Sequence, residues 1–147
     1  MKAQFLVIVS ACLVLAAGCS KEDPTKRDWE KLQGVWTLVA AEIDGGKSEV
    51  GAKFSMRVEI KGDKYELTEV EEGKKEKTRG AIKVDPSQKP KAVDFRYKQL
   101  GLKGIYELDG DSLKVCFHLV EGEPRPKEFS AKKGSRQALM VWKREKH

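Results

Sequence analysis

The chain has 147 residues, of which 39% are hydrophobic and 35% are charged, and its formal net charge is +6. This length suits one globular domain and excludes a multidomain enzyme, and the hydrophobic content is higher than that of disordered chains. Three cysteines are too few for a disulfide-stapled miniprotein, and a single long apolar run excludes a polytopic membrane protein.

The first eighteen residues have the pattern of a secretory signal. Met1 and Lys2 give a positively charged start, and from Ala3 to Gly18 the chain carries no charge. A transmembrane anchor is the alternative. It is disfavoured because a helix needs about 20 apolar residues to cross a bilayer, and this run ends early in small residues.

The end of this segment, Leu15-Ala16-Ala17-Gly18-Cys19, resembles the lipobox of bacterial lipoproteins, although Ala16 stands where the lipobox usually has Leu. The resemblance implies cleavage before Cys19 and acylation of its sulfur. Ser20 lacks the acidic side chain that favours retention in the inner membrane, which implies the outer membrane. We therefore expect residues 1–18 to be a lipoprotein signal peptide and the mature protein to be lipid-anchored in the cell envelope, facing the periplasm. Ordinary cleavage, with Cys19 left as a free thiol, is the alternative.

The mature chain begins with a polar stretch followed by a helical signal. Residues 19–30 are expected to form a tether, since Ser20 to Arg27 are polar and include Pro24. Asp28, followed by an apolar pair at i and i+3, predicts a short helical turn before Gly34.

From Val35 onward the apolar side chains alternate with polar ones, which is typical of strands with one buried face. Short strands joined by tight turns predict an all-β fold, a single antiparallel barrel of about eight to nine strands over residues 31–147. The expected strands are Val35–Ile43, Phe54–Ile60, Tyr65–Val70, Thr78–Val84, Ala92–Tyr97, Ile105–Leu108, Leu113–Phe117, Glu128–Ser130 and Gln137–Trp142.

The opening of the first strand, Gly34-Val35-Trp36, resembles the Gly-x-Trp start of lipocalins and related calycin barrels. The resemblance implies that Trp36 closes one end of the barrel and that a basic residue from the end of the chain packs over it. Arg144 is the candidate for that residue, with Lys143 and Arg136 as alternatives.

A longer resemblance covers about residues 32–145. The chain is similar there to a family of small uncharacterised lipocalin-like domains best known from planctomycete bacteria. The segments that carry it are residues 32–36, 61–65, 85–92, 104–111 and 125–129. The resemblance implies a lipocalin-like barrel and no particular activity.

The chain offers few residues for catalysis or metal binding. Its histidines are His118 and His147, and no Gly-x-Ser-x-Gly elbow is present. Asp109-Gly110-Asp111 predicts a hairpin turn, because the ligand spacing of a calcium-binding loop does not follow it. Cys116 lies in an apolar strand, where a cysteine commonly acts as a small hydrophobic residue. We expect no enzyme, no cofactor and no metal.

Charged residues of both signs are interspersed, as in residues 71–77, which predicts a solvated surface. A nucleic-acid site would gather basic residues on one face with aromatic residues between them, so no nucleic-acid partner is expected. The expected partners are the membrane, through the lipid anchor, and a small apolar ligand. A protein partner cannot be named from the sequence.

Strand parity places five aromatic residues inside the barrel, and two interpretations of the interior are open. The side chains either fill a packed core or line a cavity in which the tyrosine hydroxyls orient a ligand. The leading hypothesis is a non-catalytic binding module for a small apolar or amphipathic ligand. The alternative is an interaction or structural module of the envelope with a filled core, which docks through its exterior or through Glu121 to Pro126. The candidate ligand-binding residues are Tyr65, Tyr97, Tyr106, Phe95 and Phe117.

Overall fold

The computed structural model describes residues 21–146 of the chain. The predicted signal peptide, residues 1–18, and the predicted acylation site Cys19 lie outside the described residues. Within the described part, no helix is long and apolar enough to cross a membrane.

A single α-helix, α1 (Pro24–Leu32), precedes the barrel. Asp23 caps it by accepting a hydrogen bond of 2.9 Å from the backbone N–H of Thr25, and a proline suits the first helical position. The helix therefore starts four residues before the turn expected at Asp28 and includes residues 24–30 of the expected tether. Asp28 is buried in the second turn.

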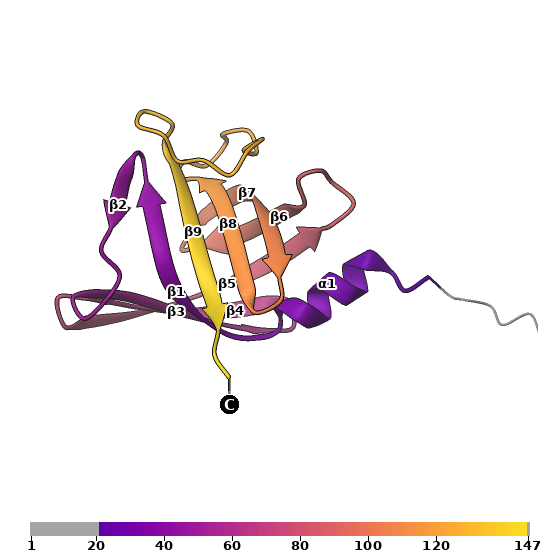
Figure 1. The fold of residues 1–147 in the computed structure, drawn as a ribbon, viewed down its shortest axis with the longest axis horizontal. Helices are drawn as coiled ribbons and strands as arrows, with labels where there is room; N and C mark the ends of the chain where they lie inside the picture. Colours follow the sequence, from indigo (N-terminus) through magenta and orange to yellow (C-terminus); the bar gives the residue numbers. More distant parts are fainter. Residues whose placement is uncertain (1–20, 147) are drawn as a thin grey trace, which may run out of the picture.

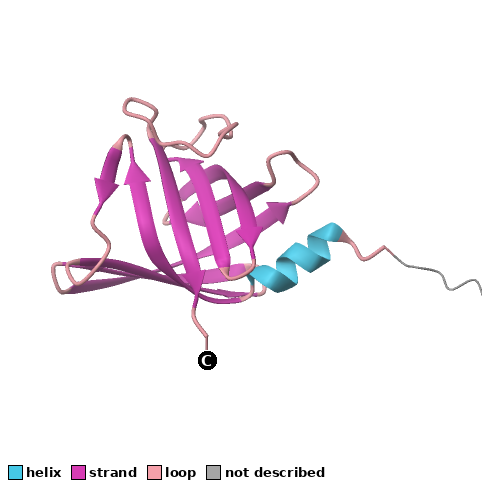
Figure 2. Ribbon diagram, viewed as in Figure 1, coloured by secondary structure: helices cyan, strands magenta, loops and turns pink. Residues whose placement is uncertain are grey.

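Nine antiparallel strands follow α1 and wrap into a barrel (Figures 1 and 2). The sheet order is β2-β1-β3-β4-β5-β6-β7-β8-β9, and β9 also pairs with β1. Eight strands thus close the barrel, and β2 is an extra strand at the edge of β1, which confirms the predicted closed all-β barrel with a short N-terminal helix. The strands are β1 (Gly34–Ile43), β2 (Gly46–Ser48), β3 (Phe54–Lys61), β4 (Lys64–Glu71), β5 (Lys74–Asp85), β6 (Ala92–Tyr97), β7 (Leu100–Asp109), β8 (Ser112–His118) and β9 (Gln137–Arg144).

One expected strand, Glu128–Ser130, is not formed. Strand β8 already pairs with β7 and β9, so both of its edges are occupied and this segment has no strand to join. It instead crosses the outer face of β8, where the backbone carbonyl of Ser130 lies 3.2 Å from the sulfur of Cys116. Cys116 is consequently fully buried, and burial raises the pKa of its thiol.

The turns of the up-and-down barrel gather at two ends. The closed end carries α1 and the connections at residues 62–63, 86–91 and 110–111. Gln33 joins two of these features, since its side-chain amide bonds to the backbone of Gly62 and to the carbonyl of Trp29. The open end carries the connections at residues 44–45, 72–73, 98–99 and 119–136.

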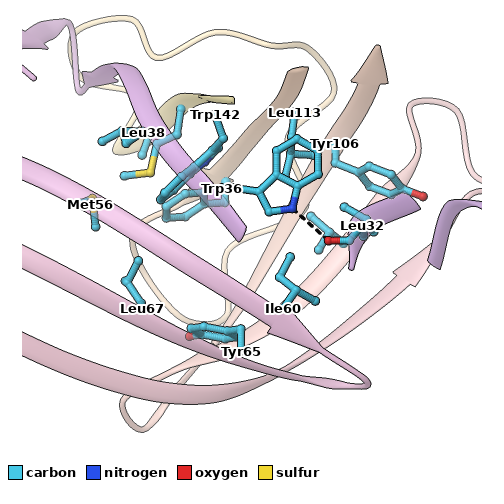
Figure 3. Packing of buried hydrophobic residues seen from close by; sticks show 14 of the residues in the cluster. Leu32, Trp36, Leu38, Met56, Ile60, Tyr65, Leu67, Tyr106, Leu113 and Trp142 are labelled. Carbon is cyan, nitrogen blue, oxygen red and sulfur yellow. Dashed lines mark hydrogen bonds between the residues drawn. The ribbon is translucent and has the colours of Figure 1, made fainter. Parts of the chain in front are cut away.

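The packed core fills the closed end. Trp36 and Leu38 are at most 1% exposed, and Leu32 from α1 and Tyr106 from β7, each 2% exposed, join them. Figure 3 shows Trp36 at the centre of this cluster, with its indole N–H directed at the backbone carbonyl of Leu32. The close packing at this end agrees with the filled-core interpretation of the sequence, but only part of the barrel interior is packed in this way.

Candidate functional site

The candidate barrel-closing residues meet at the closed end. The indole N–H of Trp36 donates to the carbonyl of Leu32 at 2.9 Å, and the guanidinium carbon of Arg144 lies 4.2 Å from the Trp36 ring centroid. The Arg144 side chain also donates to the carbonyls of Gln33, at 2.7 Å, and Lys31. A Cβ on Gly34 would come within 3.2 Å of this guanidinium, and its φ of +112° favours glycine.

The two alternatives for the basic residue lie elsewhere. Lys143 is exposed on β9, facing away from Trp36. Arg136 lies at the open end, where it forms an ion pair of 2.6 Å with Glu123.

A buried carboxylate fastens α1 to the barrel. Asp28 is 3% exposed, and its Oδ2 accepts hydrogen bonds of 2.7 Å from the hydroxyl of Tyr106 and from Nζ of Lys91. Burial acts to raise the pKa of Asp28, but these hydrogen bonds and the charges of Lys91 and Arg27 outweigh it, so the pKa lies below its ordinary value of 3.8. The same arrangement raises the pKa of Tyr106, through burial first and the Asp28 hydrogen bond second.

Inside the barrel, toward the open end, lies a cavity of about 370 Å³. It reaches the surface beside Leu100 and Leu119, whose exposed fractions are 39% and 38%. Its floor is the packed core, since Ile60 and Trp142 belong to both. The lining is almost entirely apolar: Ile43, Phe54, Met56, Val58, Ile60, Tyr65, Leu67, Glu69, Ile82, Val93, Phe95, Tyr97, Leu100, Leu102, Leu113, Val115, Phe117, Leu119, Met140 and Trp142.

Four of the five candidate ligand-binding residues line this cavity. Phe95 and Phe117 pack edge to face there, with ring centroids 5.0 Å apart and an interplanar angle of 85°. Tyr65 and Tyr97 stand nearby on β4 and β6. Tyr106 departs from the expectation: it is 2% exposed and is absent from the lining, because its hydroxyl is directed at Asp28 in the closed end.

The hydroxyls of the two cavity tyrosines already have partners. Tyr65 donates to the backbone carbonyl of Arg96, and Tyr97 donates to Oε2 of Glu69 at 3.0 Å. Burial is the main reason that the pKa of Tyr65 is raised to about 12, and burial with the Glu69 hydrogen bond raises the pKa of Tyr97. Both hydroxyls therefore remain protonated donors at neutral pH, and the Tyr65 hydroxyl is used within the barrel wall.

The wall beside these tyrosines has a seam between β5 and β6. The two strands pair only over Ile82–Asp85 and Ala92–Phe95, and the rest of β5 pairs with β4 alone. At Gly80 the carbonyl of Arg96 approaches the inner face of β5, and the Tyr65 ring covers the same position. Side chains thus bridge the seam where the strand ladder stops.

Glu69 is the site residue that the sequence analysis missed. Strand parity from Tyr65 and Leu67 continues to position 69, and the structure places this side chain in the lining. The alternation that assigned the apolar residues to the interior therefore also contained the signal for the acidic one.

The segment from Glu121 to Pro126, expected as a docking loop, is held against the barrel. Nη1 of Arg125 donates to the carbonyls of Val93 and Gly104 at 3.0 and 2.8 Å and pairs with Asp94 at 2.8 Å. Pro126 is buried. The charged side chain of Arg125 is therefore used in contacts with the barrel.

The described residues contain no group of three or more His, Cys, Asp or Glu side chains placed to hold a metal. His118 lies on the outer face of β8, with Nε2 at 3.1 Å from Nε2 of Gln137. It is not one of the residues that line the cavity.

No family model matches the chain, and no curated protein sequence matches it. Two solved structures align with most of the chain, both of the fluorescent protein UnaG. A crystal structure of a point mutant covers 80% of this chain and 99% of its own, with 11% identity and a TM-score of 0.40. The wild-type crystal structure covers 79% and 98%, with 13% identity and a TM-score of 0.38.

Proposed function

We propose that the protein is a non-catalytic binding module that holds one small apolar or amphipathic molecule inside its barrel. The observation that carries this proposal is the cavity of about 370 Å³ in the open half. Ligand sites commonly measure ~300–1,000 Å³ and have mostly apolar walls with a few polar groups. At roughly 30 Å³ per water-sized group, the cavity holds about a dozen such groups, or one short aliphatic chain.

The division of the interior supports this proposal over a uniformly filled core. Trp36, Leu32 and Tyr106 pack the closed end, whereas the aromatic residues of the open half, such as Phe95 and Phe117, stand around the cavity. A barrel that needed only stability would gain from filling this space, because each buried methylene contributes roughly 0.8 kcal/mol. An interaction or structural module remains the competing hypothesis, and it predicts no ligand uptake.

We further propose that the module is anchored in the cell envelope through an acyl group on Cys19, faces the periplasm and resides at the outer membrane. The lipobox-like end of the first eighteen residues supports this proposal. Four residues lie between Cys19 and Pro24, so the five Cα–Cα steps span at most about 18 Å, which would hold the barrel close to the membrane surface. Membership of the lipocalin-like domains best known from planctomycetes stays a prediction from the quoted segments.

Ligand uptake is tested with a neutral fluorescent probe, N-phenyl-1-naphthylamine, titrated into the full chain carrying Cys19→Ser so that no acyl group is added. We expect saturable binding that is lost when Val58→Phe and Val115→Phe together fill the cavity. The matched control is Val39→Phe, the same change at a side chain that is 47% exposed on the exterior. Equal binding by all three proteins would contradict a site inside the barrel.

The anchor is tested separately by growing cells with labelled palmitate. We expect label on the mature protein and none on the Cys19→Ser variant, which should also leave the membrane fraction. Unlabelled mature protein would contradict the lipid anchor and would leave the binding proposal intact.

A further inference from the structure

The cavity has one charged side chain in its wall. Among the twenty lining residues, Glu69 carries a carboxylate, and the lining includes no Lys, Arg or His. The other oxygen-bearing side chains are those of Tyr65 and Tyr97, which already donate their protons to Arg96 and Glu69. The lining also includes the indole N–H of Trp142, a neutral donor in the deeper part of the cavity. A head group beside Glu69 therefore meets acceptors and no cationic side chain of the lining.

Glu69 is positioned to receive a ligand group. It lies on β4 opposite Met56 of β3, near the open end, and its Oε2 accepts the Tyr97 hydroxyl at 3.0 Å. Within residues 21–146 its Oε1 has no hydrogen-bond partner in the structure. The Tyr97 bond holds the carboxylate against the wall, while one oxygen remains to accept a hydrogen bond.

A basic side chain, Lys98, stands at the same end of the barrel but pairs with another acidic group. Lys98 follows β6 directly, and its Nζ forms an ion pair of 3.1 Å with Glu76 and lies 5.3 Å from the ring centroid of Tyr97. Glu76 lies opposite Glu69 across β4 and β5, so Lys98 offsets a second acidic group at the same end. Lys98 is half-exposed and lies outside the lining.

These charges discriminate between head groups. A carboxylate ligand would bring a second negative charge beside Glu69, where the lining offers it no cationic partner, and this is costly in an apolar cavity. A protonated amine would form a charge-assisted hydrogen bond to Glu69, and a hydroxyl would form a neutral one. The apolar tail would in either case occupy the deeper part, toward Ile60 and Trp142.

We propose that the cavity takes an aliphatic amphiphile whose head donates a hydrogen bond, with a protonated amine preferred, and that Glu69 makes the selection against carboxylates. This inference rests on the proposed function, because it concerns the ligand class of the same cavity.

The test compares three competitors with one tail, dodecylamine, 1-dodecanol and dodecanoate, each displacing N-phenyl-1-naphthylamine at neutral pH below micelle-forming concentrations. The protein is the full chain with Cys19→Ser, alone and with Glu69→Gln. The matched control is Glu66→Gln, which removes the same charge from the outer face of the same strand. All variants share the N-terminal segment, so probe bound there cancels in the comparison.

We expect the amine to bind on the order of tenfold more tightly than the carboxylate, with the alcohol between them. Glu69→Gln should remove the advantage of the amine, and Glu66→Gln should preserve it. Dodecanoate binding as tightly as the amine, or a preference that survives Glu69→Gln, would overturn the inference while the binding function stands. If the probe and all three competitors fail to bind, the proposed function falls together with the inference.

Discussion

The guanidinium of Arg144 lies over the Trp36 ring, 4.2 Å from its centroid to the guanidinium carbon, so the end of the last strand seals the start of the first. The two residues are also Cα partners in the β1–β9 ladder. Because Arg144 additionally donates to the carbonyls of Lys31 and Gln33, it joins the end of α1 to the sheet.

Removing this side chain should destabilise the fold. We expect Arg144→Ala to lower the free energy of unfolding by about 2–3 kcal/mol, because it loses a cation–π contact and charged hydrogen bonds to two carbonyls. Lys143→Ala, at the exposed neighbouring position, should change it by less than about 0.5 kcal/mol. Urea denaturation followed by tryptophan fluorescence measures both values, and equal effects would contradict the sealing role.

The seam between β5 and β6 predicts a strict requirement for glycine at position 80. A Cβ there would lie 2.7 Å from Cε1 of Tyr65 and closer still to the carbonyl oxygen of Arg96. We expect Gly80→Ala to cost about 2 kcal/mol through overpacking. Gly51→Ala is the matched control, because nothing lies within 4 Å of its Cβ position. Thermal or urea unfolding measures the stability of both variants. If Gly80→Ala left the free energy of unfolding unchanged, the close packing of Tyr65 and Arg96 against position 80 would not constrain the fold.

The buried Asp28 predicts a component of acid sensitivity. Its pKa in the folded protein lies below the ordinary value of 3.8, so the ionised form stabilises the fold above that value. This contribution is lost as the pH falls below about 4 through the folded-state pKa. We expect Asp28→Asn to cost about 1–3 kcal/mol at pH 7 and clearly less at pH 3.

The pH comparison needs a control because other carboxylates titrate in the same range. Asp109→Asn, at an exposed position at the end of β7, should leave the pH dependence of unfolding like that of the unaltered protein. A constant stability difference between Asp28→Asn and the unaltered protein from pH 7 to pH 3 would argue against an ionised Asp28 in the fold.

The contacts of Arg125 predict that it immobilises the segment at residues 119–136. In Arg125→Ala the two carbonyl hydrogen bonds and the pair with Asp94 are gone, so backbone amides of this segment should exchange with deuterium several-fold faster. Lys127→Ala, an exposed change in the same segment, should leave the exchange unaltered. Hydrogen–deuterium exchange measured by mass spectrometry gives the exchange rate of each peptide. Similar rates in the two variants would contradict the immobilisation of this segment by Arg125.

Alternation of apolar and polar residues was sufficient to predict the barrel because its strands bury one face. Phe54–Lys61 shows this directly, with Met56 and Ile60 buried and Arg57 exposed between them. Strand β2 escaped prediction because its three residues, Gly46–Ser48, bury no apolar side chain and form a strand only through pairing with β1. Glu128–Ser130 had the composition of a strand but no available edge, which is a property of the assembled sheet.

The cavity could be predicted only in part, because parity tells which face a side chain takes and not how far the neighbouring side chains reach. Tyr65 and Tyr106 have the same inward parity, yet Tyr65 borders the cavity and Tyr106 packs at the other end against a helix side chain. Asp28 was expected as a helix cap and became the partner of Tyr106, since the earlier Asp23-Pro24 start shifted the helix.

The positions of α1 and the cavity entrance have a consequence for cargo exchange. The chain enters the barrel through α1 at the closed end (Figure 1). The cavity entrance beside Leu100 and Leu119 lies at the opposite end, with the connections at residues 98–99 and 119–136. With Cys19 acylated as proposed, the cavity entrance would face the aqueous compartment and point away from the membrane leaflet that holds the acyl group. In this orientation the cavity would take up a ligand from a soluble carrier or from a membrane facing the open end. To take up a ligand from the membrane that holds the acyl group, the whole domain would have to rotate about its N-terminal tether.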